Sequence, residues 1–284
     1  GAFTTPTERL RSAMHEDMVL RQRQQSSSTQ NSNDQFPIPP IVSTNRINAP
    51  DTAEVLLGDG VSDLISMARP LLADPDFLLK AMNERAKSIN TCIACNQACL
   101  DHAFQNKIAS CLVNPRACHE TELVYEPVSE PKRIAVIGAG PAGLSCSTVA
   151  ASRGHHVTLF DASSEIGGQF NMAKQIPGKE EFYETLRYFK RQLEITGVTT
   201  RLNTVVEEET LSRREFDEVV IATGVHPRQV RFPGADHPKV MSYIDVLRNK
   251  KPVGEEVVVI EDVVDRREWD EALEAMDATV EEVR

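Results

Sequence analysis

The sequence predicts an α/β protein in which two segments of parallel βαβ structure are separated by a cysteine-rich loop. Between residues 41 and 68, short apolar strands alternate with a helical stretch. Between residues 132 and 161, a strand, a glycine-rich turn, a helix and a second strand follow one another, and four closely spaced cysteines lie between the two segments. Because alternating strands and helices are typical of parallel sheets covered by helices, both segments are expected to be parts of such sheets.

Composition and charge narrow the class of protein. A chain of 284 residues can hold about two domains. With 31 Lys and Arg against 42 Asp and Glu, the net charge is -11 and no basic stripe is present, so nucleic acid is not an expected partner. No apolar run of about 18 residues and no signal-peptide pattern occurs, so no membrane association is expected. Five of the six cysteines lie between residues 92 and 118, which indicates metal ligation in a reducing compartment, the cytoplasm, rather than disulfides.

Residues 1–38 are expected to form an amphipathic helix followed by a disordered insertion. Apolar residues recur at helical spacing in residues 7–21, with charged residues between them. From Gln22 to Gln35 the sequence has few apolar residues, so burial cannot compensate the entropy that ordering would cost.

The next segment, residues 39–90, has a βαβ rhythm. Strands are predicted at 41–44 and 64–68, a helix at 51–57, and a further helix from about residue 74. Arg46 and Arg69 follow directly after the two strands, where an arginine is well placed to bind a phosphate group. The alternative is that both arginines form ordinary surface ion pairs.

A loop over residues 91–120 carries Cys92, Cys95, Cys99 and Cys111, with the spacing C-x2-C-x3-C-x11-C. Thiolates are the ligands of iron–sulfur clusters, and this spacing predicts a [4Fe–4S] cluster, with a structural zinc ion as the alternative. Cys118 is expected to pack nearby without ligating, and Cys146 is expected in the core.

The segment after residue 131 carries a dinucleotide-binding pattern. The predicted strand 132–137 leads into Gly138-Ala139-Gly140-Pro141-Ala142-Gly143, which opens a helix that continues to about Ser152. Gly138 allows the tight turn, Gly140 allows the backbone to approach a pyrophosphate, and Gly143 allows close packing of helix and sheet. A second strand, 156–160, ends at Asp161, whose carboxylate can bind ribose hydroxyls. A glycine-rich turn without a ligand is the alternative.

Further positions extend this pattern toward the end of the chain. Gly168 and Gln169 indicate a second close approach of the backbone to the same cofactor, although a surface turn would look alike. A buried strand is predicted within 216–224, ending in the small residues Thr223 and Gly224, and another strand at 257–260. No second glycine-rich turn follows; residues 261–284 are predicted to form an acidic amphipathic helix.

These motifs resemble the bacterial-type 2,4-dienoyl-CoA reductases, which belong to the old-yellow-enzyme-related flavin and iron–sulfur oxidoreductases. The resemblance extends from about residue 41 to residue 260. It rests on STNRIN, SMARPLLADP, CIACNQACLD, SCLVNPRACHE, IAVIGAGPAGL, IGGQFNMAKQIPGKEEFYETLRYF and VVIATGVHPR.

The resemblance implies a fold and a set of cofactors. It identifies residues 39–90 as the end of an FMN-type TIM barrel, 91–120 as the cluster loop and 131–260 as an incomplete Rossmann-like FAD-binding domain. It implies that the four cysteines bind the cluster and that Arg46, Ala68 and Arg69 contact the FMN phosphate. The residues that it implies for FAD are Gly138, Gly140, Gly143, Asp161, Gln169 and Thr223.

In such enzymes electrons pass from NADPH through FAD and the cluster to FMN, which then reduces an unsaturated fatty acyl-CoA in β-oxidation. NADPH delivers two electrons together whereas a cluster carries one, so a flavin is needed on each side of the cluster.

The chain departs from this family pattern in three respects. Only two barrel strands are recognisable, and the second glycine-rich motif for NADPH and the segment that completes the FAD domain are missing. No family catalytic residue is therefore present, and the chain, which does not begin with Met, is expected to be part of a longer enzyme and inactive alone. The alternatives are a non-catalytic electron-transfer module and a zinc-stabilised nucleotide-binding protein.

Overall fold

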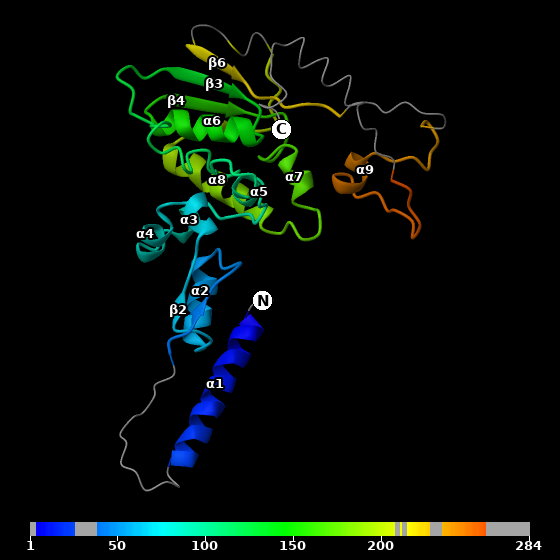
Figure 1. Ribbon diagram of the computed structural model, residues 1–284. Helices are drawn as coiled ribbons and strands as arrows, with labels where there is room; N and C mark the ends of the chain where they lie inside the picture. The colour runs from blue at the N-terminus through cyan, green and yellow to red at the C-terminus, as the bar shows by residue number, and fades with distance from the viewer. Residues whose placement is uncertain (1–3, 26–38, 208–210, 212–214, 228–234, 260–284) are drawn as a thin grey trace. The chain divides into compact units, whose positions relative to one another are not determined.

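The computed structural model describes residues 4–25, 39–207, 211, 215–227 and 235–259. The chain divides into two compact units, Gly1–Gly224 and Val225–Arg284. All the helices and strands described below, except one helix, belong to the first unit (Figure 1). Each unit is considered by itself.

The first unit begins with helix α1, Thr4–Gln25. This helix extends beyond the predicted end at residue 21, so the disordered insertion expected from Gln22 does not begin there; residues 26–38 lie outside the described part. Arg11 fixes α1 to the following segment, since its guanidinium donates to the Val61 carbonyl and forms an ion pair of 2.6 Å with Asp63. Met14 and Met18 are half-buried, but Leu10, the first residue of the predicted apolar face, is 53 % exposed, so this face is only partly covered.

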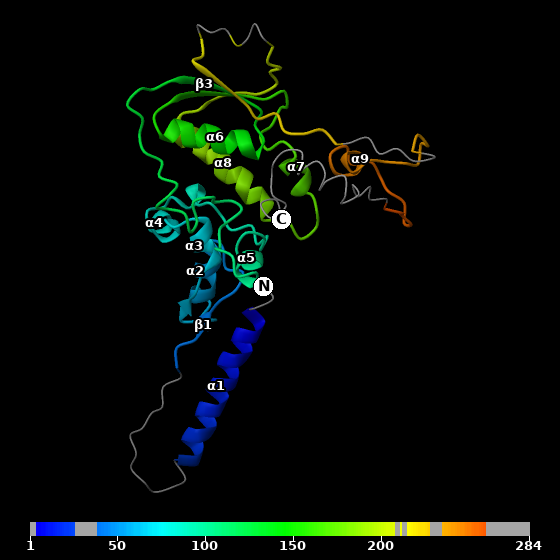
Figure 2. The same cartoon turned by 45° about the horizontal axis from the view of Figure 1, so that its top comes forward.

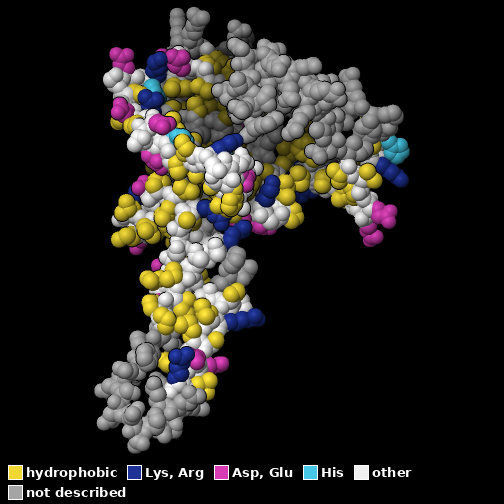
Figure 3. Space-filling model, in the orientation of Figure 1, with side chains coloured by type: hydrophobic (Ala, Val, Ile, Leu, Met, Phe, Trp, Pro, Cys, Tyr) yellow, Lys and Arg dark blue, Asp and Glu magenta, His cyan; other side chains and the backbone are white. Residues whose placement is uncertain are grey.

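A small βαβ unit follows. Strands β1 (Val42–Ser43) and β2 (Leu64–Ile65) pair in parallel, with Val42 opposite Leu64. Helix α2 (Pro50–Gly58) connects them and buries Leu56 in a small core with Ile47 and Val61. Hydrophobic side chains nevertheless remain on the surface of this segment (Figure 3), including Val42, Val55 and Leu64. Two short strands with one helix cannot cover all of their apolar surface.

Short helices lead into the cysteine loop: α3 (Arg69–Ala73), α4 (Phe77–Met82), the 3-10 helix η1 (Ala86–Ser88) and, after the third cysteine, α5 (Leu100–Phe104). Phe77 anchors α4 in the core, whereas the hydrophobic residues Leu78, Leu79 and Met82 of this helix are exposed.

The larger sheet contains four parallel strands in the order β5-β4-β3-β6. Its strands are β3 (Arg133–Ile137), β4 (His156–Phe160), β5 (Thr199–Arg201) and β6 (Glu218–Ile221). Strands β3 and β4 were predicted from the sequence and are confirmed. Together with the two-stranded parallel sheet, they confirm the predicted α/β class with a Rossmann-like second part.

Two helices lie on the same face of this sheet (Figure 1, Figure 2): α6 (Pro141–Ser152) and α8 (Phe182–Thr196), which also pack on each other. Leu144 of α6 and Leu193 of α8 join the main core. Helix α8 ends at Gly197, which adopts φ +73°, a left-handed conformation that glycine accepts without strain. A short helix, α7 (Phe170–Ala173), precedes α8, and Phe170 stacks on Phe182 with ring centroids 4.9 Å apart.

Two predictions about the later strands are wrong. Strand β6 is not buried: the Ile221 side chain is 77 % exposed, and among the described strands β6 lies at the edge of the sheet, next to β3. Residues 257–259 form no strand, and Val258 and Val259 are 86 % exposed. A β-rich sequence becomes a strand only when a partner strand accepts its hydrogen bonds, and the second unit has none among its described residues.

The described part of the second unit contains one helix, α9 (Tyr243–Leu247), with Ser242 and Asp245 forming a capping box. The predicted helix 261–284 lies outside the described residues. None of the helices described in either unit is both long enough and apolar enough to cross a membrane.

Candidate functional site

The four predicted cluster cysteines line a common hollow. Cys92, Cys95, Cys99 and Cys111 surround a space of about 320 Å³, which includes the part open to solvent. Cys99 immediately precedes α5, and the backbone N–H of Ser110 donates to the Ala98 carbonyl at 2.7 Å, which brings the fourth cysteine back to the first three. The structure therefore gathers side chains that are up to 19 residues apart in the sequence.

Four thiols around one hollow are a donor set for a [4Fe–4S] cluster or, as the alternative, a zinc ion, and these two groups require different ligand spacings. A tetrahedral zinc ion with Zn–S bonds of about 2.3 Å requires its ligand sulfurs to lie about 4 Å apart. In a [4Fe–4S] cube each thiolate binds a different iron, so the ligands stand further apart around a larger group. Four cysteines around one hollow are a suitable donor set for it.

Burial shifts the pKa of two of these thiols. It raises the pKa of Cys92 and of Cys111. Backbone N–H groups of Ala94, Val113 and Asn114 act in the opposite direction by hydrogen bonding to these two thiols. Since a metal binds the thiolate, metal binding must displace the thiol protons, and N–H donors to ligand sulfurs are among the features that set cluster potentials.

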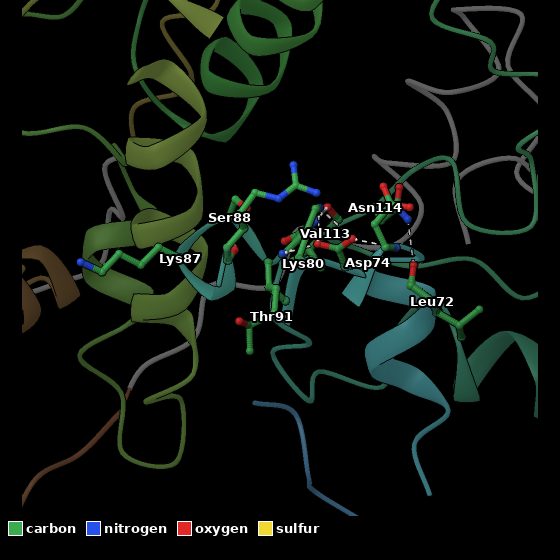
Figure 4. Close-up of polar contacts among 12 residues, drawn as sticks. Leu72, Asp74, Lys80, Lys87, Ser88, Thr91, Val113 and Asn114 are labelled. Atoms are coloured by element: carbon green, nitrogen blue, oxygen red, sulfur yellow. Dashed lines mark hydrogen bonds and ion pairs between the residues drawn. The ribbon is translucent and has the colours of Figure 1, made fainter. Parts of the chain in front are cut away.

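A buried carboxylate holds the cysteine loop against the preceding helices (Figure 4). Asp74, which is 2 % exposed, accepts hydrogen bonds from Lys80 at 2.6 Å and from the Asn90 backbone N–H at 2.8 Å. The Asn90 side chain donates to the Val113 carbonyl at 2.7 Å, and that of Asn114 donates to the Leu72 carbonyl at 2.8 Å. Both ends of the loop are thereby fixed to the same support.

A second hollow lies where strands β1 and β2 end. It measures about 450 Å³ with its solvent-open part, and the candidate phosphate-binding residues Arg46, Ala68 and Arg69 line it together. Arg69 and Cys92 line both hollows, so the two candidate sites adjoin.

The two arginines also have protein partners. Arg46 forms an ion pair of 2.6 Å with Glu181, at the start of α8, and Arg69 donates to the Asn96 side chain in the cysteine loop. Arg46 adopts φ +56°, next to Asn45 at φ +72°. Such conformations are strained for residues other than glycine and are found where the surrounding structure requires them. The surface ion pair considered above as an alternative is thus present for Arg46, beside the hollow.

The glycine-rich turn has the tight geometry that the sequence predicted. Gly138 adopts φ +108°, and a Cβ there would lie 2.2 Å from the Ala222 carbonyl oxygen, beyond the end of β6. A Cβ on Gly143 would lie 1.8 Å from the Gly138 carbonyl oxygen. These two glycines are required by the fold itself.

Gly140 differs, because a Cβ there would meet nothing within 4 Å. It lies at the start of α6, where Pro141 and Ala142 are exposed, so the first turn of the helix opens to solvent. Free N–H groups at a helix N-terminus favour anions such as a pyrophosphate. The cradle therefore has room for a ligand where the fingerprint predicts one.

The other candidate FAD residues gather around this turn. The Asp161 carboxylate accepts from the backbone N–H groups of Ala139 at 2.6 Å and Ser163 at 2.7 Å, and a carboxylate has further lone pairs for ribose hydroxyls. A Cβ on Gly168 would lie 3.1 Å from the Gly140 Cα, and one on Gly138 would lie 3.0 Å from the Thr223 Cα. Gln169 follows Gly168 in the chain and Gly224 follows Thr223, and both residues are exposed.

The two remaining cysteines lie apart from the hollow. Cys118 is exposed, which makes its predicted packing wrong; it adopts φ +65° at the tight turn that precedes Glu120. Cys146 on α6 packs against the main core as predicted.

Sequence reasoning missed several residues that support the site: Asp74, Asn48, Glu181, Glu184 and Arg187. Asn48 donates to the Cys92 carbonyl at 2.9 Å. Glu184 and Arg187, three residues apart on α8, form an ion pair of 2.6 Å. The helical spacing of this pair was visible in the sequence, but the contact of Arg187 with Thr91 of the cysteine loop, 96 residues away in the chain, was not.

Comparison with known proteins gives the same two parts in the same order. Residues 4–88 match the NADH:flavin oxidoreductase / NADH oxidase family, and residues 132–260 match the pyridine nucleotide-disulphide oxidoreductase family. The chain is therefore similar to part of an old-yellow-enzyme-related flavin oxidoreductase. The two matched families imply an FMN-binding part and an FAD- or NAD(P)-binding part. The assignment of an iron–sulfur cluster rests only on the resemblance of the sequence motifs.

Individual relatives support the match. A metal reductase of Desulforamulus reducens is 41 % identical over 78 % of this chain and 34 % of the relative, and a bilirubin reductase of Mediterraneibacter gnavus is 34 % identical over the same shares. The structure of 2-naphthoyl-CoA reductase with 2-naphthoyl-CoA is similar with a TM-score of 0.72 and 37 % identity, over 76 % of this chain and 33 % of the other. The chain therefore spans about a third of the length of these relatives.

Proposed function

We propose that this chain is the cluster- and FAD-binding part of an NADPH-dependent oxidoreductase that reduces conjugated acyl-CoA thioesters of the 2,4-dienoyl-CoA type. The observation that carries the proposal is the sharing of Arg69 and Cys92 by the four-cysteine hollow and the hollow beside Arg46. A redox centre in the first hollow would adjoin a phosphate-bearing cofactor in the second.

The residues of the chain have distinct roles in this proposal. The four cysteines hold the cluster, and Arg46 and Arg69 bind the FMN phosphate as paired cations. The first turn of α6 binds the FAD pyrophosphate, and Asp161 binds its ribose. When bound, the flavins exchange a hydride or single electrons and the cluster carries single electrons, which links a two-electron donor to a two-electron acceptor.

Two observations support an acyl-CoA substrate. The stretch at residues 166–189 resembles the dienoyl-CoA reductases, and a structurally similar relative is named for its action on 2-naphthoyl-CoA. The names of other relatives, a metal reductase and a bilirubin reductase, indicate that the shared electron-transfer part serves different acceptors. The acceptor pocket of such an enzyme would belong to the barrel part that this chain does not match.

The decisive experiment is anaerobic purification followed by an absorption spectrum and assays for iron, sulfide, zinc and both flavins. We expect a brown protein with about four irons and four sulfides per chain, as a single [4Fe–4S] cluster requires, together with bound FAD. A colourless preparation that contains zinc would contradict both the cluster and the flavin assignments.

A second candidate, a non-catalytic electron-transfer module, is favoured by the gathering of all candidate cluster and flavin residues in the first compact unit. Turnover by the chain alone tests the second candidate. The chain alone, supplied with NADPH, FAD, FMN and a 2,4-dienoyl-CoA, is expected to give no multiple-turnover reduction. Sustained reduction would rule out the non-catalytic candidate and the expectation that the chain is inactive alone.

A further inference from the structure

One arginine joins the FAD-binding domain to the start of the cysteine loop. Arg187 lies in the middle of α8, and its guanidinium donates to the backbone carbonyls of Lys87 and Ile89, the latter at 2.8 Å. It also donates to the Thr91 hydroxyl at 3.1 Å. Three acceptors from one five-residue segment thus meet a single side chain from a helix about 100 residues later.

The orientation of this guanidinium is fixed from its own helix. Glu184, one turn earlier, accepts from the Arg187 Nε at 2.6 Å and from the Thr91 hydroxyl at 3.4 Å. The planar fork of arginine can bind several acceptors at once only when its plane is held in place. Glu184 and Arg187 therefore act as a pair toward Thr91.

The segment that this pair contacts is otherwise supported from the cysteine side. Ile89 and Thr91 are buried, and the Asn90 backbone is held by Asp74. Thr91 directly precedes Cys92, the cysteine that lines both hollows. On its other side, α8 packs against α6, the helix that begins at the glycine-rich turn.

We propose that Arg187, oriented by Glu184, is a positioning residue that fixes Thr91 and Cys92 relative to the FAD-binding domain. This inference rests on the proposed function, because Arg187 would set the separation between the FAD-binding turn and the cluster. A continuous set of contacts then runs from the turn at Gly140 through α6 and α8 to the first cluster ligand.

The first test uses the chain without iron or flavin and so does not depend on either cofactor. Hydrogen exchange of the peptide spanning residues 86–95 is compared in the wild type, R187M and R191M. Arg191 is the matched control, because it forms the same kind of ion pair with Glu194, three residues later on α8, at the exposed surface. Exchange in R187M is expected to be at least about tenfold faster, the effect of losing one charged hydrogen bond, with R191M unchanged. Equal exchange in R187M and the wild type would overturn the inference.

A conservative variant separates the geometry from the charge. R187K keeps the positive charge, but an ammonium group lacks the planar fork and cannot reach all three acceptors together. It is expected to protect the peptide only partly. Full protection in R187K would contradict the role assigned to the fork. R187K is also the variant to use for every comparison if R187M does not fold, as judged by circular dichroism.

The second test measures electron transfer after anaerobic reconstitution with iron, sulfide and FAD. One electron passes from photoreduced FAD to the oxidised cluster, and the absorbance of the cluster reports its arrival. At equal iron and FAD content, transfer in R187M is expected to be slower by on the order of tenfold or more, since small displacements of reacting groups have large kinetic effects, while R191M matches the wild type. Lower cofactor content with an unchanged rate would mean that Arg187 serves stability only. Failure of the wild type to bind iron would contradict the proposed function, and the exchange experiment would still decide on Arg187.

Discussion

At the scale of single residues, the glycines at the start of α6 have separable roles. A Cβ on Gly143 would collide with the Gly138 carbonyl at 1.8 Å, whereas one on Gly140 would enter open space. Gly140 also has φ −75°, a value that alanine accepts. Replacing Gly143 by alanine should therefore damage the fold, whereas replacing Gly140 by alanine should damage only the ligand site.

We predict that G143A lowers the free energy of unfolding by about 3 kcal/mol, the upper range for overpacking a tight contact. G140A should leave that free energy nearly unchanged and weaken FAD binding about tenfold or more, because the backbone must approach the pyrophosphate there. Urea unfolding and flavin titration measure the two quantities. Equal destabilisation by both variants would contradict this division of roles.

Tyr188 provides a residue-scale prediction of pH dependence. Burial, followed by the nearby Asp74 and Tyr125, raises the pKa of Tyr188 from 10.0 to about 12. The unfolded chain would therefore lose this proton at lower pH than the folded chain, so stability falls as the pH rises from 10 to 12. Y188F should remove this part of the alkaline loss, up to about 3 kcal/mol at about 1.4 kcal/mol per pH unit.

The measurement is urea unfolding of wild type and Y188F between pH 9 and pH 12, with Y183F as the control. Tyr183 lies on the same helix but is exposed. If the difference between wild type and Y188F did not change with pH, the shifted pKa of Tyr188 would not contribute to stability.

At the scale of elements, the cysteine loop depends on a buried carboxylate that belongs to a different element. Asp74 ends α3, pairs with Lys80 of α4 and accepts the Asn90 N–H two residues before the first cysteine. Removing one partner of a buried ion pair costs more than the pair contributes, because the other group is left without compensation.

We predict that D74A destabilises the first unit by about 3 kcal/mol and lowers iron uptake. D76A is the matched control, since Asp76 is exposed and makes no side-chain cap for α4. Urea unfolding and iron analysis after reconstitution measure the effects. Iron uptake by D74A at the wild-type level would show that the loop forms its hollow without this support.

At the scale of the whole chain, the candidate site residues all lie between Arg46 and Gly224, within the first compact unit. The apolar surface around β1, β2 and α4 also belongs to this unit (Figure 3).

We predict that a chain shortened to end after Gly224 binds the same amount of iron and FAD per molecule as the full chain, because no candidate ligand is removed. Iron and flavin analysis of both proteins, prepared in parallel, tests this. A selective loss of iron or FAD in the shortened chain would show that the second unit contributes to the sites.

The sequence by itself determined the α/β class, the strand–glycine–helix unit at 133–152 and the four cysteines, because each rests on local spacing or on residues with special chemistry. Only the tertiary structure decided that β6 is exposed, that residues 257–259 form no strand, and that Arg46 pairs with Glu181. It also decided that Arg187 reaches Thr91. Burial and long-range pairing depend on which neighbours the folded chain supplies, and no local pattern of residues carries that information.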